Sequence, residues 1–228
     1  MMAYWPHLLL LALVAVLFVW ERFKPQAVAQ LEESCLVGLM FLITAVSFGQ
    51  VVARYGFNTG WSAALEFTTL AFSWLILLGM SYGIRAGTHL GVDILLKALP
   101  APIMRYVAAL GALAGLLYGL ILLDASWMSY LGVDTRSGAI EYWQKMYKIN
   151  IGTEELRWPI WVQETFDVKD RVQRWLVLIM LPVGLALLSF RSLQAMVQIL
   201  SGKRDMVIAS HEAEELVEEN KGVLKELD

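Results

Sequence analysis

Long apolar stretches run through most of the chain and are interrupted by short polar ones. Four of them are long enough to cross a membrane, because about 20 apolar residues rising about 1.5 Å each span roughly 30 Å of hydrocarbon. The predicted spans are Ser34–Ala53, Ser62–Ile84, Tyr106–Leu131 and Val172–Phe190, the last continuing toward Leu200. No stretch alternates with the period of two that a membrane barrel needs. We therefore predict an all-α integral membrane protein with four tilted transmembrane helices, an extra N-terminal hydrophobic helix and interfacial helices.

The first apolar run, Leu8–Trp20, is short for a span, since its thirteen residues make about 20 Å of helix. Three interpretations are open: a signal sequence, a short fifth span or a helix in the membrane interface. The small residues Ala27-Val28-Ala29 favour a signal sequence, but no Lys or Arg precedes the run. The run lacks the polar face of an interfacial helix, which favours burial against protein or lipid. The sequence leaves the choice open.

Basic residues in the short loops predict the orientation. Residues 85–105 carry three of them and residues 54–61 carry one, and the side richer in Lys and Arg is cytoplasmic. The predicted domains are an N-terminal helix with a cytoplasmic linker (1–33), a four-span membrane domain (34–200) with an outer loop (132–171), and an acidic cytoplasmic tail (201–228).

Composition excludes several classes of protein. The chain is 58% hydrophobic and 17% charged with a net charge of −3, so it lacks the basic excess of a nucleic-acid binder. Its single cysteine, Cys35, excludes internal disulfides and cysteine-rich metal clusters. Of the three histidines only His89 lies near a span, which argues against a haem held by a histidine pair and against a zinc centre. With no Walker loop or nucleophile–base pair either, we predict no enzyme activity, no cofactor and no metal.

Glycines recur along one face of two predicted spans. The two triplets are Gly79, Gly83 and Gly87, and Gly111, Gly115 and Gly119, each at i, i+4 and i+8. Small residues at this spacing let helix backbones approach closely in lipid. We consider two interpretations, tight packing of the second span against the third, and reception of a helix from another subunit in at least one groove.

Two carboxylates, Glu66 and Asp124, lie within the predicted spans, where a charge costs about 2.5–3.5 kcal/mol at the bilayer centre. Glu66 is about one turn into its helix, where the helix dipole favours negative charge. Asp124 is open to pairing with a cation, protonation or contact with water. A transport path would need more polar neighbours than Thr68, Thr69 and Ser126 supply.

An ordered series of residues carries a family resemblance. The series is Arg54-Tyr55, Trp61, Glu66, Trp74, Gly79 and Arg85-x-Gly-x-His89-Leu-Gly-Val-Asp93. It resembles the small membrane subunit of tripartite ATP-independent periplasmic (TRAP) transporters, the DctQ-like family, over residues 30–131 and more loosely over the last span. In the family a tryptophan stands three residues before the second of two adjacent glutamates. Here Trp61 stands five residues before Glu66, and Leu65 takes the place of the first glutamate. The chain therefore lacks the carboxylate pair of the family pattern, which argues against any role that needs such a pair.

The resemblance implies four spans in the bacterial inner membrane with both termini cytoplasmic. It also implies two protein partners: a large membrane subunit, a symporter with substrate and sodium sites, and a periplasmic solute-binding protein. The small subunit would then act as a scaffold, in contact with membrane lipid, that braces the large subunit and widens the docking surface. It would carry no site of its own, and Gly79, Gly83, Gly87, Gly111, Gly115 and Gly119 are the predicted helix-packing or subunit-interface residues.

The predicted outer loop and the C-terminal tail differ in composition from the spans. Residues 141–149 mix aromatic and charged side chains, as expected of an interfacial helix, which covers the membrane surface or forms part of the docking face. A long aromatic loop resembles the four-carbon dicarboxylate branch of the family. The tail 205–228 holds eight acids and two lysines and fits a short solvated amphipathic helix to which we assign no function.

Two other functions remain as alternatives to the scaffold. An independent homo-oligomeric carrier or channel would line its path with Glu66 or Asp124. An enzyme anchor would carry a bound chromophore.

Overall fold

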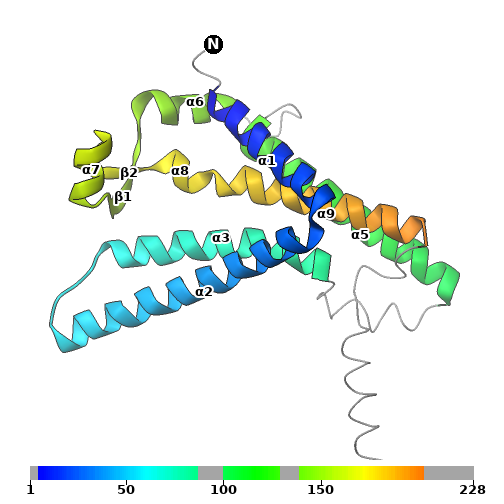
Figure 1. Ribbon diagram of the computed structural model, residues 1–228, viewed down its shortest axis with the longest axis horizontal. Helices are drawn as coiled ribbons and strands as arrows, with labels where there is room; N and C mark the ends of the chain where they lie inside the picture. Colours follow the sequence, from blue (N-terminus) through cyan, green and yellow to red (C-terminus); the bar gives the residue numbers. More distant parts are fainter. Residues whose placement is uncertain (1–4, 87–99, 129–138, 203–228) are drawn as a thin grey trace, which may run out of the picture. The chain divides into compact units, whose positions relative to one another are not determined.

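The computed structural model describes residues 5–86, 100–128 and 139–202. Along the chain they form α1 (Trp5–Phe23), α2 (Pro25–Gly56), α3 (Ala63–Ala86), α5 (Ala101–Leu123), a π-helical turn (Asp124–Met128), α6 (Ala139–Ile149), β1 (Gly152–Arg157), α7 (Ile160–Phe166), β2 (Arg171–Gln173), α8 (Arg174–Leu178) and α9 (Met180–Leu200) (Figure 1). The candidate residues Gly87, His89 and Asp93, and nearly all of the predicted tail, lie outside the described residues.

Within the described residues, four helical segments have the length and composition of membrane spans: Pro25–Gly56, Ala63–Ala86, Ile103–Trp127 and Arg174–Leu200. They confirm the predicted all-α membrane fold. The first of them contains 32 residues, about 48 Å of helix, which exceeds the roughly 30 Å hydrocarbon core. It begins nine residues before the predicted start at Ser34, because Pro25 occupies the first helical position, where its missing N–H costs nothing.

The helices belong to two compact units whose divisions fall inside α3, α5 and α9. Unit 1 comprises Met1–Gly79 and Gly119–Leu187, and unit 2 comprises Met80–Tyr118 and Leu188–Asp228.

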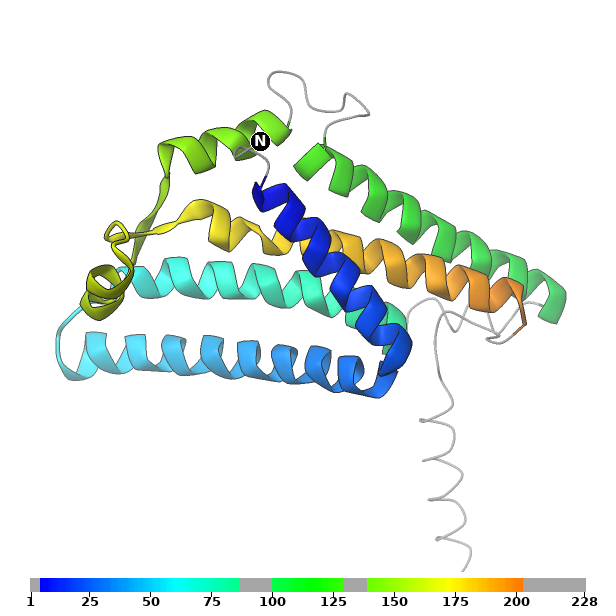
Figure 2. The same ribbon diagram turned by 45° about the horizontal axis from the view of Figure 1, so that its top comes forward.

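In unit 1, α2 and α3 lie side by side and antiparallel, and α1 folds back from the start of α2 at Lys24 (Figures 1 and 2). The turn between α2 and α3 is closed by the N–H groups of Phe57 and Thr59, which both donate to the Ala53 carbonyl at 3.3 and 3.0 Å. Asn58 takes the left-handed conformation there (φ 51°), which asparagine tolerates better than most residues.

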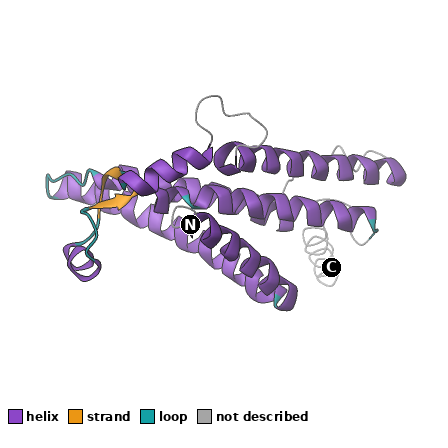
Figure 3. Ribbon diagram, turned by 90° about the horizontal axis from the view of Figure 1, so that it is seen from above, coloured by secondary structure: helices purple, strands orange, loops and turns teal. Residues whose placement is uncertain are grey.

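A small antiparallel sheet of β1 and β2 lies in unit 1, largely within the loop predicted to be outer, and we call it the outer sheet (Figure 3). Gly152 pairs with Gln173 and Arg157 with Arg171, and α7 bridges the two strands. The sequence analysis predicted no strand here, because Gly152–Arg157 lacks the apolar alternation that marks a strand with one buried face.

In unit 2, α5 packs against the C-terminal part of α9. The contact is made by small residues, since Ala108, Ala112 and Ala195 are at most 5% exposed. Arg105 donates from its guanidinium to the carbonyls of Ile199, at 2.8 Å, and Leu200. The last carbonyls of a helix have no partner within the helix, and the helix dipole also favours a cation near them. The Ile199 carbonyl accepts the Gly202 N–H at 3.1 Å as well.

Candidate functional site

Glu66 joins the start of α3 to the outer sheet. Its carboxylate accepts three backbone hydrogen bonds from β1: from the N–H of Glu154 at 2.9 Å, of Glu155 at 2.7 Å and of Leu156 at 2.8 Å. Charge-assisted bonds of this kind are about twice as strong as neutral ones. The carboxylate also lies in the first turn of α3, where the helix dipole favours it. We call this arrangement the Glu66 latch.

Other polar contacts fix the shape of the outer sheet and α7. The Trp158 indole N–H donates to Gln173 Oε1 at 3.1 Å, and the Trp158 backbone N–H donates to the Asp170 carbonyl at 2.7 Å. The Gln163 side chain donates to the Trp158 carbonyl at 2.7 Å. The segment from β1 to β2 is thus held together by its own hydrogen bonds and joined to α3 by the Glu66 latch. We call this segment the outer cap, after the predicted outer loop.

Trp74, in the middle of α3, fastens the fourth span to the second. Its indole N–H donates to the Val177 carbonyl at 2.8 Å, close to the break between α8 and α9 at Ile179. A carbonyl released by a helix break needs a partner in a membrane, because no water is present to supply one.

Two further motif residues, Arg54 and Arg85, lie at helix ends. Arg54, in the last turn of α2, lines a surface hollow of about 350 Å³ together with Asn58 and Trp61. The Arg85 guanidinium lies 5.2 Å from the centre of the Tyr82 ring, a cation–π distance.

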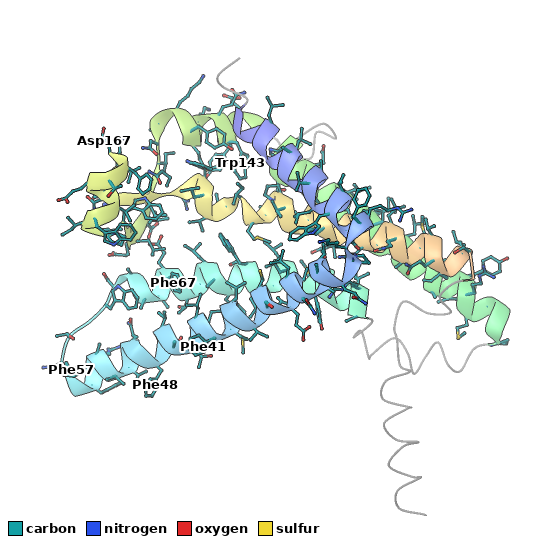
Figure 4. The ribbon with its side chains drawn as sticks, viewed as in Figure 1. Phe41, Phe48, Phe57, Phe67, Trp143 and Asp167 are labelled. Carbon is teal, nitrogen blue, oxygen red and sulfur yellow. The ribbon has the colours of Figure 1, made fainter. Side chains whose placement is uncertain are left out.

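Asp124 begins the π-helical turn at the end of α5 and is only 5% exposed. Such turns leave carbonyls out of the helical ladder, and here the Ser126 carbonyl accepts the indole N–H of Trp143 in α6 at 3.0 Å. Trp143, labelled in Figure 4, is 2% exposed. Burial raises the pKa of the neighbouring Tyr147 hydroxyl. Thus α6, predicted as an interfacial helix, is a helix fastened to the end of α5; its place in the membrane interface stays a prediction.

All the glycines of the two predicted grooves except Gly87 lie within the described residues. A side chain at Gly79 would lie 4.0 Å from Leu36 of α2, and one at Gly115 would lie 3.1 Å from the Ser192 hydroxyl of α9. Gly111 has nothing within 4 Å, whereas Gly83 and Gly119 are buried. Gly79 and Gly115 thus face the first and fourth spans, and the pairing of the second span with the third through these glycines stays a prediction.

An apolar stripe on α2 was missed by the sequence analysis. Five of its side chains are at least 52% exposed: Val37, Phe41, Phe48, Val51 and Tyr55. With Thr44, they follow the alternating spacing of four and three residues that forms the contact seam between paired helices. Phe41 and Phe48 lie on the side of α2 opposite α3 (Figure 4). This spacing was visible in the sequence. We call these residues the α2 stripe.

The described residues contain no group of three His, Cys, Asp or Glu side chains able to hold a metal ion. No solved structure matches the chain. The family model described as tripartite ATP-independent periplasmic transporters, DctQ component, matches residues 43–202.

Curated relatives agree with the family model. The chain is 33% identical over 207 residues, 91% of its length and 87% of the relative's, to a C4-dicarboxylate TRAP transporter small permease protein DctQ of Vibrio cholerae. It is 30% identical over 161 residues, 71% of its length and 64% of the relative's, to the protein of the same description from Pseudomonas aeruginosa. A putative TRAP transporter small permease protein of Haemophilus influenzae is 28% identical over 98 residues, 43% of this chain and 61% of the relative. The family model and these relatives identify the chain as a member of the DctQ family of TRAP transporter membrane subunits.

Proposed function

We propose that the protein is the scaffold subunit of a dicarboxylate TRAP transporter of the bacterial inner membrane. It braces a large transport subunit and helps a periplasmic solute-binding protein to dock, and it moves no solute itself. Both termini are cytoplasmic and the outer cap faces the periplasm. The Vibrio cholerae and Pseudomonas aeruginosa relatives are described as subunits of C4-dicarboxylate transporters, which supports four-carbon dicarboxylates as the solute.

The Glu66 latch is the observation that carries the proposal. A carboxylate in a transport path exchanges its partners as solute and ions pass. The Glu66 carboxylate is instead occupied by three backbone N–H groups of β1, which suits a fixed support for the outer cap. This use favours the scaffold over an independent carrier or channel that needs Glu66 in its path.

The α2 stripe supports the bracing role. Its spacing is that of a seam between helices, and its exposed phenylalanines offer a large contact area to a transmembrane helix of the large subunit.

Co-purification tests the proposal. We expect the tagged chain to capture the large subunit from membranes of cells that express both. We expect replacing Phe41 and Phe48 together by alanine to lower the captured amount about tenfold, because both side chains lie on the stripe. Phe72→Ala, an exposed phenylalanine of α3, serves as the control and leaves capture unchanged. Equal capture by the double variant contradicts the bracing face, and saturable dicarboxylate uptake by the chain alone in liposomes contradicts the scaffold role.

Docking is tested separately. Glu66→Ala releases the outer cap but leaves the α2 stripe intact. We expect capture of the large subunit to persist while the affinity of the complex for the solute-binding protein falls. Unchanged affinity in this variant contradicts a docking role for the cap.

A further inference from the structure

Unit 1 contains an apolar cleft that the scaffold role does not use. It lies between α1, α2, α3 and the first part of α9 and has a volume of about 420 Å³. Trp74 and Leu42 are among the side chains that line it. Of the described side chains on its wall, Glu21, Glu32 and Cys35 are the ionisable ones. A site this poor in polar partners does not hold ordered water well.

The cleft has one charged end. Glu21 and Glu32 line it near the corner where α1 meets α2. Arg22 and Lys24 lie at the same corner and are exposed. The apolar part runs along α2 from Glu32 to Leu42, ten residues, which is about 15 Å of helix. This length is half of the roughly 30 Å hydrocarbon core, the depth of one leaflet.

The size of the cleft indicates what kind of molecule fits it. With a volume of about 420 Å³, the cleft is a narrow space that one hydrocarbon chain can fill. A single hydrocarbon chain matches both its length and its narrow, apolar wall.

The charged residues at the α1–α2 corner indicate which phospholipid headgroup fits there. A phospholipid phosphate needs cations, which Arg22 and Lys24 supply, and an ammonium group needs carboxylates, which Glu21 and Glu32 supply. With Glu33 the corner carries three acids and two bases, so its net charge of −1 disfavours an anionic lipid. We propose that the cleft binds one acyl chain of a zwitterionic aminophospholipid whose headgroup lies at the α1–α2 corner.

Gly38 allows a specific test. It lines the cleft, and a side chain added there would meet nothing within 4 Å. In Gly38→Leu the new side chain therefore occupies the cleft without displacing protein atoms. Gly49→Leu is the matched control, since Gly49 lies on the same helix, also has open space around it and is not on the cleft wall.

The test is native mass spectrometry of the full-length chain in detergent, titrated with dioleoyl phosphatidylethanolamine or phosphatidylglycerol. We expect the unmodified chain and Gly49→Leu to retain one phosphatidylethanolamine with equal affinity, and Gly38→Leu to bind it about tenfold more weakly. Equal retention by Gly38→Leu, or an equal loss in Gly49→Leu, overturns the proposal. Equal retention of phosphatidylglycerol overturns the choice of headgroup.

Cys35 gives a second measurement that needs no variant. It is the single cysteine of the chain, is exposed and lines the cleft. We expect phosphatidylethanolamine to slow its alkylation by a water-soluble maleimide several-fold, and an unchanged rate overturns the proposal. A loss of large-subunit capture in Gly38→Leu, with lipid retention unchanged, assigns the cleft to a protein partner and overturns the proposal as well.

Discussion

Replacing Glu66 by alanine removes the acceptor of three backbone hydrogen bonds and leaves the rest of α3 in place. The bonds are 2.7–2.9 Å long and end on one carboxylate. Hydrogen bonds to a charged group contribute roughly 1.5–3 kcal/mol each. Two of the three lie where the chain is exposed, so water replaces part of their energy. We therefore expect the opening of the outer cap to become easier by about 2–4 kcal/mol.

Hydrogen–deuterium exchange measures this opening directly. In Glu66→Ala we expect the amides of residues 152–173 to exchange about 30- to 700-fold faster, since each 1.4 kcal/mol corresponds to a factor of about ten. The amides of α2 keep their rates, because the latch does not contact that helix. In Glu66→Gln we expect a smaller increase, since one carbonyl oxygen still accepts.

Glu164→Ala is the control for the change in charge. Glu164 is an exposed carboxylate of α7 in the same outer cap, and its removal should leave the exchange rates unchanged. An acceleration below about threefold in Glu66→Ala, or an equal one in Glu164→Ala, would show that the Glu66 carboxylate does not hold the cap.

Four further substitutions test other contacts. Gly115→Leu places a side chain against the Ser192 hydroxyl, which lies 3.1 Å from the new Cβ, and should lower the stability of the protein in detergent by about 1–3 kcal/mol. Gly111→Leu is the control, because its side chain enters open space and should leave the stability unchanged. Equal melting temperatures of the two variants would refute this packing. Gly152→Ala brings its Cβ within 2.5 Å of Arg171 Cβ and should raise proteolysis of the outer cap. Arg105→Met removes the donor to the last carbonyls of α9 and should cost about 1.5–3 kcal/mol, measured by thermal unfolding.

Some of the fold follows from local pattern and some does not. The spans were predicted because hydropathy over about 20 residues is enough to identify a membrane helix. The outer sheet was missed, since Gly152–Arg157 shows no alternation. The sequence predicted Glu66 in the first turn of a helix, as the structure has it. Its partners are backbone N–H groups some 90 residues away, and backbone groups leave no signal in the sequence. The α2 stripe was visible in the spacing, but its exposure needed the structure.

The Glu66 latch has an evolutionary consequence. Glu154, Glu155 and Leu156 contribute only their main-chain N–H groups to it, and every amino acid except proline carries such a group. Mutation can therefore rewrite the side chains of this strand without loosening its anchor. The exposed surface of this strand can thus change in sequence while a single acidic residue of α3 keeps it in place.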